Sequence, residues 1–283
     1  MNPNGPGVRA DRMTEYAMGR TAGERERLGI QDRIFSPHSA NLFRQAGIGP
    51  GDHVLDAGCG TGATTRLLAE LVGPAGSVIG IDNDPASLEL AEAQTRASGL
   101  ANVRYREGDL TDLVHEETVD AVTGRIVLVH ISDPVTVLAH LARCVRPGGL
   151  IAFQDISCSR VRGVPQIPAM ADWVSWMFVL TAHAGLDADI GEHLPALFAR
   201  AGLTDVNAVA VSVIGDSNSL MPRYLAETLT SVGPLAVASG AATQQQVREF
   251  RDRLLEQAVE HGSMLYAPEL TSAWARVAED TDG

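Results

Sequence analysis

Short apolar runs alternate with longer segments of mixed polarity between residues 37 and 157. Val54 and Leu55 end one such run, and residues 64–72 behind them have the length and spacing of a helix. The other runs that we expect to form strands lie at residues 77–82, 103–110, 119–122, 150–153, 205–214 and 264–277. This alternation predicts an α/β fold with a doubly wound, mostly parallel seven-stranded sheet, which binds ligands at the carboxyl ends of its strands.

Helix starts are marked by a capping residue followed by proline. Asp84-Pro85 and Asp133-Pro134 predict two helix starts of this kind. Ser36-Pro37 predicts a third, so we expect one helix from there to Gly47 and a separate surface helix over residues 21–34.

A glycine-rich loop follows the first predicted strand. Its sequence, Asp56-Ala57-Gly58-Cys59-Gly60-Thr61-Gly62, places glycines at alternate positions between an acid and a helix N-terminus. Because glycine lacks a side chain, a ligand can lie directly against this backbone, and the free N–H groups of the helix favour an anionic group there. The acid could accept a hydrogen bond from a cationic amine. The spacing G-x-G-x-G differs from the G-x-G-x-x-G of dinucleotide-binding folds and disfavours a nicotinamide cofactor.

Acidic residues also follow the next two predicted strands. Asp82 ends the second strand, about 20 residues beyond the glycine loop, where an acid typically binds a ribose diol. Asp109 comes directly after the third strand. Because the carboxyl ends of parallel strands lie along one edge of a sheet, we expect Asp56, Asp82 and Asp109 to form one site.

These motifs, in this order, resemble those of class I S-adenosylmethionine-dependent methyltransferases, in particular the branch that acts on small molecules and in quinone biosynthesis. The resemblance rests on the glycine loop, Gly80-Ile81-Asp82, Gly108-Asp109-Leu110 and Arg146-Pro147-Gly148-Gly149, and it covers residues 37–157. It implies S-adenosyl-L-methionine as cofactor, with the glycine loop at the methionine part, Asp82 at the ribose and Asp109 at the adenine. The candidate cofactor-binding residues are Tyr16, Gln31, Asp56, Gly58, Cys59, Gly60, Asp82, Asn83, Asp109, Leu110 and Arg125.

Several of these positions have a second interpretation. Tyr16 and Gln31 belong to a leading segment that could close over the cofactor or only pack on the core. Cys59 suits a tight bend simply as a small residue. Arg125 could contact a carboxylate of cofactor or substrate, or could brace a loop. His130 is either a general base, since an ordinary histidine pKa is near neutrality, or a histidine satisfied by its surroundings.

A helical stripe follows the fifth predicted strand. Trp173, Trp176, Met177 and Leu180 recur at i, i+3, i+4 and i+7. The stripe is either an apolar face that packs on the core or an aromatic wall of a pocket for a flat organic substrate. In the second interpretation Trp173, Trp176, Met177 and His183 contact the substrate.

The chain departs twice from strand–helix alternation after residue 157. Residues 158–187 contain the stripe, and residues 216–262 contain the capping box Thr243-x-x-Gln246. We expect both to be helical cap insertions. The expected division is residues 1–36, N-terminal arm and lid helix; 37–157, cofactor-binding α/β core; 158–187, helical cap insertion; 188–215, core continuation; 216–262, helical flap insertion; and 263–283, closing strand and C-terminal tail.

Charge and composition narrow the partners. Acidic residues exceed basic ones 35 to 22, a net charge of -13, which argues against a nucleic-acid partner. No apolar run approaches the roughly 20 residues that span a bilayer, and the N-terminus has no secretory h-region, so we expect a cytoplasmic protein without a membrane partner. The 3 cysteines include no C-x-x-C pair and predict neither a metal site nor disulfides. We expect a monomer or a homodimer.

The resemblance implies methyl transfer to a small organic acceptor, which we expect to be a secondary metabolite or an aromatic, quinone-like compound. The methyl group of the cofactor is already electrophilic, so the protein has to align the acceptor and exclude water. For a phenol or amine acceptor, Tyr16, His130, Asp155 and His183 are candidate bases, and the sequence does not choose among O-, N- and C-methylation. The alternatives are a methyltransferase-like fold that binds the cofactor without methyl transfer, as a cyclase or binding partner, and, less favoured, an NAD(P)-dependent oxidoreductase.

Overall fold

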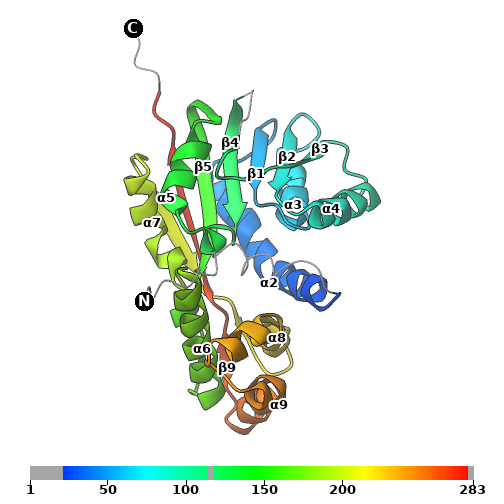
Figure 1. The fold of residues 1–283 in the computed structure, drawn as a ribbon. Coiled ribbons are helices and arrows are strands. Elements are labelled where there is room, and N and C mark those ends of the chain that lie inside the picture. Colours follow the sequence, from blue (N-terminus) through cyan, green and yellow to red (C-terminus); the bar gives the residue numbers. More distant parts are fainter. Residues whose placement is uncertain (1–21, 114–117, 280–283) are drawn as a thin grey trace, which may run out of the picture.

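A seven-stranded sheet lies at the centre of the computed structural model, which describes residues 22–113 and 118–279. The strand order is β3-β2-β1-β4-β5-β10-β7 (Figure 1). The strands are β1 (His53–Ala57), β2 (Ser77–Asp82), β3 (Val103–Glu107), β4 (Val119–Arg125), β5 (Val145–Ser157), β7 (Asn207–Val211) and β10 (Glu269–Arg276). Strand β10 runs antiparallel to both of its neighbours, β5 and β7. The predicted α/β fold with a mostly parallel seven-stranded sheet is confirmed.

Helices cover both faces of this sheet. Apolar side chains of α2 (Ala22–Ala46) and α3 (Ala63–Val72) pack on one face, and those of α5 (Pro134–Ala142) and α7 (Ile190–Arg200) pack on the other. Helix α4 (Pro85–Ala97) packs beside β2 and β3. The capping predictions hold for two of these helices. Asp84 accepts hydrogen bonds from the first-turn amides of α4, and Asp133 accepts one from the first turn of α5.

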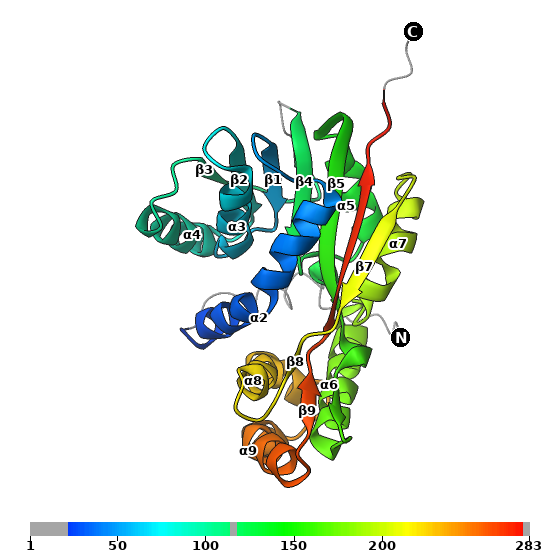
Figure 2. The same cartoon turned by 180° about the vertical axis from the view of Figure 1, so that it is seen from behind.

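Helix α2 corrects one prediction, because it continues through Pro37 where we expected a new helix to begin. Its N-terminal half buries Phe35 in the core of the cap, and its C-terminal half buries Phe43 against the sheet. Ser36 is within the helix, and its hydroxyl donates to the Asp32 carboxylate instead of capping a helix start. Proline is tolerated here because both halves are anchored by buried side chains. Figure 2 shows α2 bending between the sheet and the cap, as expected at an internal proline.

The two insertions form one cap. Its helices are α6 (Pro168–Ala184), α8 (Met221–Ala238) and α9 (Gln244–Glu260), where Thr243 and Gln246 form the predicted capping box. A small antiparallel sheet in the order β6-β9-β8 joins them, from β6 (Arg162–Val164), β8 (Ile214–Gly215) and β9 (Met264–Tyr266). Strands β4 and β5 end on the side that faces this cap (Figure 1).

Two predicted strands are each divided between the sheets. Residues 264–277 form β9 in the cap and β10 in the main sheet, and residues 205–214 extend over β7 and into β8. The chain passes from the core to the cap between β7 and β8, and from the cap back to the core between β9 and β10. Since apolar runs on either side of a bend read as one run, the sequence pattern could not separate them.

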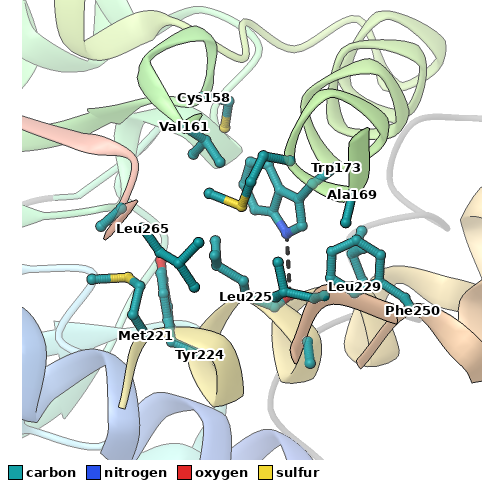
Figure 3. Close-up of a cluster of buried hydrophobic side chains, with 14 of the residues drawn as sticks. Cys158, Val161, Ala169, Trp173, Met221, Tyr224, Leu225, Leu229, Phe250 and Leu265 are labelled. Atoms are coloured by element: carbon teal, nitrogen blue, oxygen red, sulfur yellow. Dashed lines mark hydrogen bonds between the residues drawn. The ribbon is translucent and has the colours of Figure 1, made fainter. Parts of the chain in front are cut away.

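The cap has its own hydrophobic core. Trp173, Tyr224, Leu225, Leu229 and Phe250 meet there from α6, α8 and α9 (Figure 3). The indole N–H of Trp173 donates to the backbone oxygen of Leu225 at 3.1 Å, which satisfies the one polar atom of this buried side chain.

Candidate functional site

The glycine loop between β1 and α3 has the backbone that its sequence predicts. Gly58, Gly60 and Gly62 have φ angles of 65°, 50° and 75°, in the left-handed region that favours glycine. A Cβ atom on Gly58 would meet the side chain of Val127, and one on Gly62 would meet Tyr105. A Cβ atom on Gly60 would have no neighbour within 4 Å. Side chains therefore pack against the loop at Gly58 and Gly62. At Gly60 the space beside the backbone is open, and a ligand can approach there.

Asp82, at the end of β2, holds the loop. One carboxylate oxygen accepts the N–H of Gly60 at 2.7 Å, and the other accepts the N–H of Asp84 at 3.0 Å. Burial raises the pKa of Asp82, while these backbone hydrogen bonds oppose the rise. The amide of Asn83 also stabilises the charged form, so of the about four acceptor positions of a carboxylate at least one remains for a ligand such as a ribose diol.

Asp56, at the end of β1, has a buried oxygen that accepts no hydrogen bond from the described residues. The residue is 1% exposed, and its Oδ2 atom accepts the Thr65 hydroxyl at 2.6 Å. Among the described residues, no hydrogen-bond donor lies near its Oδ1 atom. Burial raises the pKa of Asp56 to about 7, against the effect of the Thr65 hydrogen bond. A buried acceptor of this kind, beside an open glycine loop, fits a hydrogen-bond donor from a bound molecule.

The remaining predicted residues of this edge lie at the ends of β2 and β3. Asp109 is exposed, and one of its oxygens accepts both the N–H and the hydroxyl of Thr111, each at 2.8 Å. Leu110 is buried, and Asn83 is exposed. Cys59 is buried within the loop, and burial strongly raises the pKa of its thiol, so it is a small apolar residue here rather than a nucleophile.

Arg125, at the end of β4, joins the sheet to α2. Its Nη2 atom pairs with Asp32 at 2.8 Å, and its Nη1 atom donates to Ser36 at 2.9 Å and to Ser39 at 3.4 Å. The guanidinium side chain is only 5% exposed. These contacts match the alternative in which Arg125 braces neighbouring structure.

His130 ends the short helix η1 (Leu128–His130), next to charges from α2. Burial lowers the pKa of His130 to about 4, the charge of Arg27 lowers it further, and Glu24 acts in the opposite direction. His130 is therefore neutral near pH 7, and its lowered pKa makes it a weak base. Arg27 bonds both to Glu24 and to the side-chain oxygen of Gln31, the latter at 2.9 Å, while Glu24 also accepts the hydroxyl of Ser231 from α8.

Sequence reasoning missed Glu24, Arg27 and Thr65. Glu24, Arg27 and Gln31 follow at i, i+3 and i+7, which places them on one face of a helix and could have marked a polar stripe. Tyr16 lies outside the described residues.

No helix in the described part of the chain is long and apolar enough to cross a membrane. Residues 22–113 and 118–279 contain no group of three or more acidic, cysteine or histidine side chains that could hold a metal ion.

The predicted substrate residues lie on α6, within the cap. Trp173 and Trp176 are 1% and 5% exposed, and Trp176 packs on Phe250 with ring centroids 5.8 Å apart. Met177 is partly buried against the same core, and His183 is exposed near the end of the helix. Both tryptophans belong to the hydrophobic core of the cap, and the Arg253 guanidinium lies 5.9 Å from the centroid of the Trp176 ring.

Comparison with known proteins relates this chain to methyltransferases. A family model described as a methyltransferase domain matches residues 48–202. The chain is 31% identical over 180 residues to a nocamycin O-methyltransferase from Saccharothrix syringae, covering 62% of this chain and 64% of that one. It is 33% identical over 128 residues to a demethylmenaquinone methyltransferase from Geobacillus stearothermophilus, covering 45% and 55%.

Among solved structures, the YcgJ protein of Bacillus subtilis shares the fold, with a TM-score of 0.55 at 16% identity over 86% of this chain and 99% of that one. The matched stretch spans 55% of the demethylmenaquinone methyltransferase. The family model, over residues 48–202, includes the glycine loop, Asp82 and Asp109, and also helix α6 of the cap.

Proposed function

The chain belongs to the methyltransferase domain family, and from this premise we propose that it transfers a methyl group from S-adenosylmethionine to a small organic acceptor. The family model covers residues 48–202, more than half of the 283 residues. That stretch contains β1, α3, β2 and β3, whose ends carry the glycine loop, Asp82 and Asp109 and form what we call the glycine-loop edge of the sheet.

The observation that supports the cofactor best is the unpartnered Asp56 oxygen beside the open backbone of Gly60. In our proposal the methionine part of the cofactor lies over Gly58 and Gly60, with its cationic amine within reach of Asp56. Asp82 offers its remaining acceptor capacity to the ribose hydroxyls. The residues present thus supply acceptors for the donors of an adenosine with a methionine tail.

S-adenosylmethionine, when bound, supplies a methyl group on a sulfonium sulfur that needs no further activation. The chain then has to bind the acceptor in line with that methyl group and to exclude water. In our proposal, helix α2 and the cap exclude water from the methyl group, because Phe43 packs α2 on the sheet and Phe35 packs it on the cap. His130 is our candidate for taking a proton from an acceptor hydroxyl or amine, although its lowered pKa makes it a weak base.

We place the acceptor between η1, the N-terminal half of α2 and α8. The support is the polar cluster of Glu24, Arg27 and Ser231, which links α2 to α8 and acts electrostatically on His130. A polar cluster in an otherwise apolar interface suits an acceptor with one polar group on an apolar frame. Trp173, Trp176, Met177 and His183 stay candidates for acceptor contact only if the cap opens, because both indoles are buried in its core.

The acceptor class that we propose is a secondary metabolite or an aromatic, quinone-like compound. Two relatives, a nocamycin O-methyltransferase and a demethylmenaquinone methyltransferase, have names that specify acceptors of this kind. The excess of acidic over basic residues, 35 to 22, also favours an acceptor that is not a polyanion.

A screen of labelled-methyl transfer tests the proposal. The purified chain is incubated with S-adenosylmethionine that carries a labelled methyl group and with a panel of phenols, quinols, amines and enols. We expect label in at least one organic acceptor and, at cofactor concentrations near the wild-type Kd, reduced transfer by an Asp82→Ala variant. Tight binding of S-adenosylhomocysteine without transfer to any acceptor would favour a non-methylating enzyme or a binding partner.

A further inference from the structure

Asp155, near the end of β5, is a fully buried carboxylate that bonds to backbone amides. It is 0% exposed. Its Oδ2 atom accepts the N–H of Val129 at 3.1 Å, and its Oδ1 atom accepts the N–H of Ile156 at 2.9 Å. Burial raises the pKa of Asp155 to about 7, while the hydrogen bonds to these amides and to those of Leu128 and Val127 act in the opposite direction. A carboxylate with these contacts has no free path to an acceptor, so it is poorly suited to the role of general base.

The amides that Asp155 binds belong to the loop after β4. Ile126, at the start of this loop, has φ 54°, which is an outlier for a β-branched residue, and its N–H donates to the Gln154 oxygen at 2.7 Å. An uncommon backbone conformation persists only where the surrounding contacts over-determine it. Here those contacts come from two consecutive residues of β5, Gln154 and Asp155.

The same loop touches the proposed cofactor site. The side chain of Val127 occupies the space where Gly58 would carry a Cβ atom, so it lies directly against the glycine loop. Three residues later, His130 ends the short helix η1. The Asp155 carboxylate, the Val127 side chain and the Gly58 backbone therefore form one continuous chain of contacts from β5 to the glycine loop.

We propose that Asp155 is a positioning residue, which holds the amides of residues 127–129 so that Val127 supports the glycine loop and His130 faces the acceptor side. This inference rests on the proposed function. It assigns to the acid at the end of β5 an indirect role through a backbone loop. The proposal predicts that loss of the amide hydrogen bonds at residue 155 loosens this loop and weakens cofactor binding without any change in a cofactor-contacting side chain.

The test compares Asp155→Asn with Phe198→Leu. Asparagine keeps the shape of the side chain, but its NH₂ group cannot accept the amide hydrogen bonds. Phe198, buried on α7 against Phe153, is the control for a general loss of stability in the same core. Two measurements are made on both variants and on the wild type: hydrogen exchange of the Val127, Leu128 and Val129 amides, and the Kd for S-adenosylhomocysteine.

In Asp155→Asn we expect faster exchange of these amides and a Kd raised about tenfold, as for the loss of a buried hydrogen bond. In Phe198→Leu we expect wild-type exchange at these amides and a Kd within about twofold, a difference too small to mark a lost hydrogen bond. Unchanged exchange in Asp155→Asn, or faster exchange with a Kd no higher than in Phe198→Leu, would overturn the proposal.

Failure of the proposed function would look different. A wild type that does not bind S-adenosylhomocysteine would contradict the cofactor assignment itself, and the role of Asp155 with it. If Asp155→Asn does not fold, Val127→Ala provides the second variant, because it removes only the side chain that touches Gly58. We then expect a raised Kd with wild-type exchange at Leu128 and Val129, and an unchanged Kd would overturn the proposal.

Discussion

Replacing Asp82 by alanine should weaken cofactor binding more than any other single change at the glycine-loop edge. The wild-type carboxylate accepts the N–H of Gly60 at 2.7 Å and that of Asp84 at 3.0 Å, and we propose that it also accepts the ribose hydroxyls. A hydrogen bond to a charged group contributes about 1.5–3 kcal/mol. Loss of the ribose contact alone therefore raises the Kd by roughly 10- to 150-fold. Isothermal titration with S-adenosylhomocysteine measures this change.

The matched control is Asp120→Ala. Asp120 also accepts one backbone N–H, from His53 at 2.8 Å, and one further hydrogen bond, from Arg146 at 2.7 Å, but at the opposite end of the sheet. We expect its replacement to leave the Kd within about twofold of the wild-type value, since it contacts no part of the glycine loop. If the Asp82→Ala and Asp120→Ala variants bind the ligand equally well, Asp82 does not belong to the site.

Three further predictions follow from buried or capping groups. The pKa of Asp56 is raised from 3.8 to about 7, so at this residue the folded chain binds more protons than the unfolded chain between these values. Asp56 therefore contributes a decrease in the free energy of unfolding as pH rises from 4 to 7. Urea unfolding at pH 5 and pH 8 should show less of this decrease in Asp56→Asn, and an identical pH dependence would refute the assignment. Arg125→Met should lower the free energy of unfolding by about 3 kcal/mol, which is the lower end for a broken buried pair because the Asp32 side chain is 32% exposed. The added change Asp32→Ala should then lower it little further. Full additivity of the two changes in urea unfolding would contradict the pairing. Thr243→Ala should cost about 1 kcal/mol through loss of its capping box, and an unchanged urea midpoint would count against that cap.

Much of the core could be predicted from local sequence. The helix starts at Asp84 and Asp133 depend on a side chain that reaches an amide two or three residues away, so neighbouring letters suffice. The glycine loop is equally local, because Gly58 and Gly60 need a backbone conformation that other residues rarely adopt. Its bond to Asp82 could be expected from the parallel arrangement of β1 and β2.

The rest depends on contacts between residues far apart in the chain. Asp32 is paired with Arg125 across 93 residues, and that pairing holds α2 where the sequence suggested a break at Pro37. The tryptophan stripe of α6 was recognised by its spacing, but spacing does not say whether a stripe faces a pocket or a core. Trp176 lies in a core because Phe250 of α9, 74 residues away in the sequence, packs against it.

The most direct test of the central claim is the cofactor that the chain binds. Isothermal titration of the wild type with S-adenosylmethionine, S-adenosylhomocysteine and NAD measures this without knowledge of the acceptor. The open backbone at Gly60, the unpartnered oxygen of Asp56 and the remaining acceptor capacity of Asp82 predict binding of the first two and none of NAD. Tighter binding of NAD than of S-adenosylhomocysteine would contradict the account.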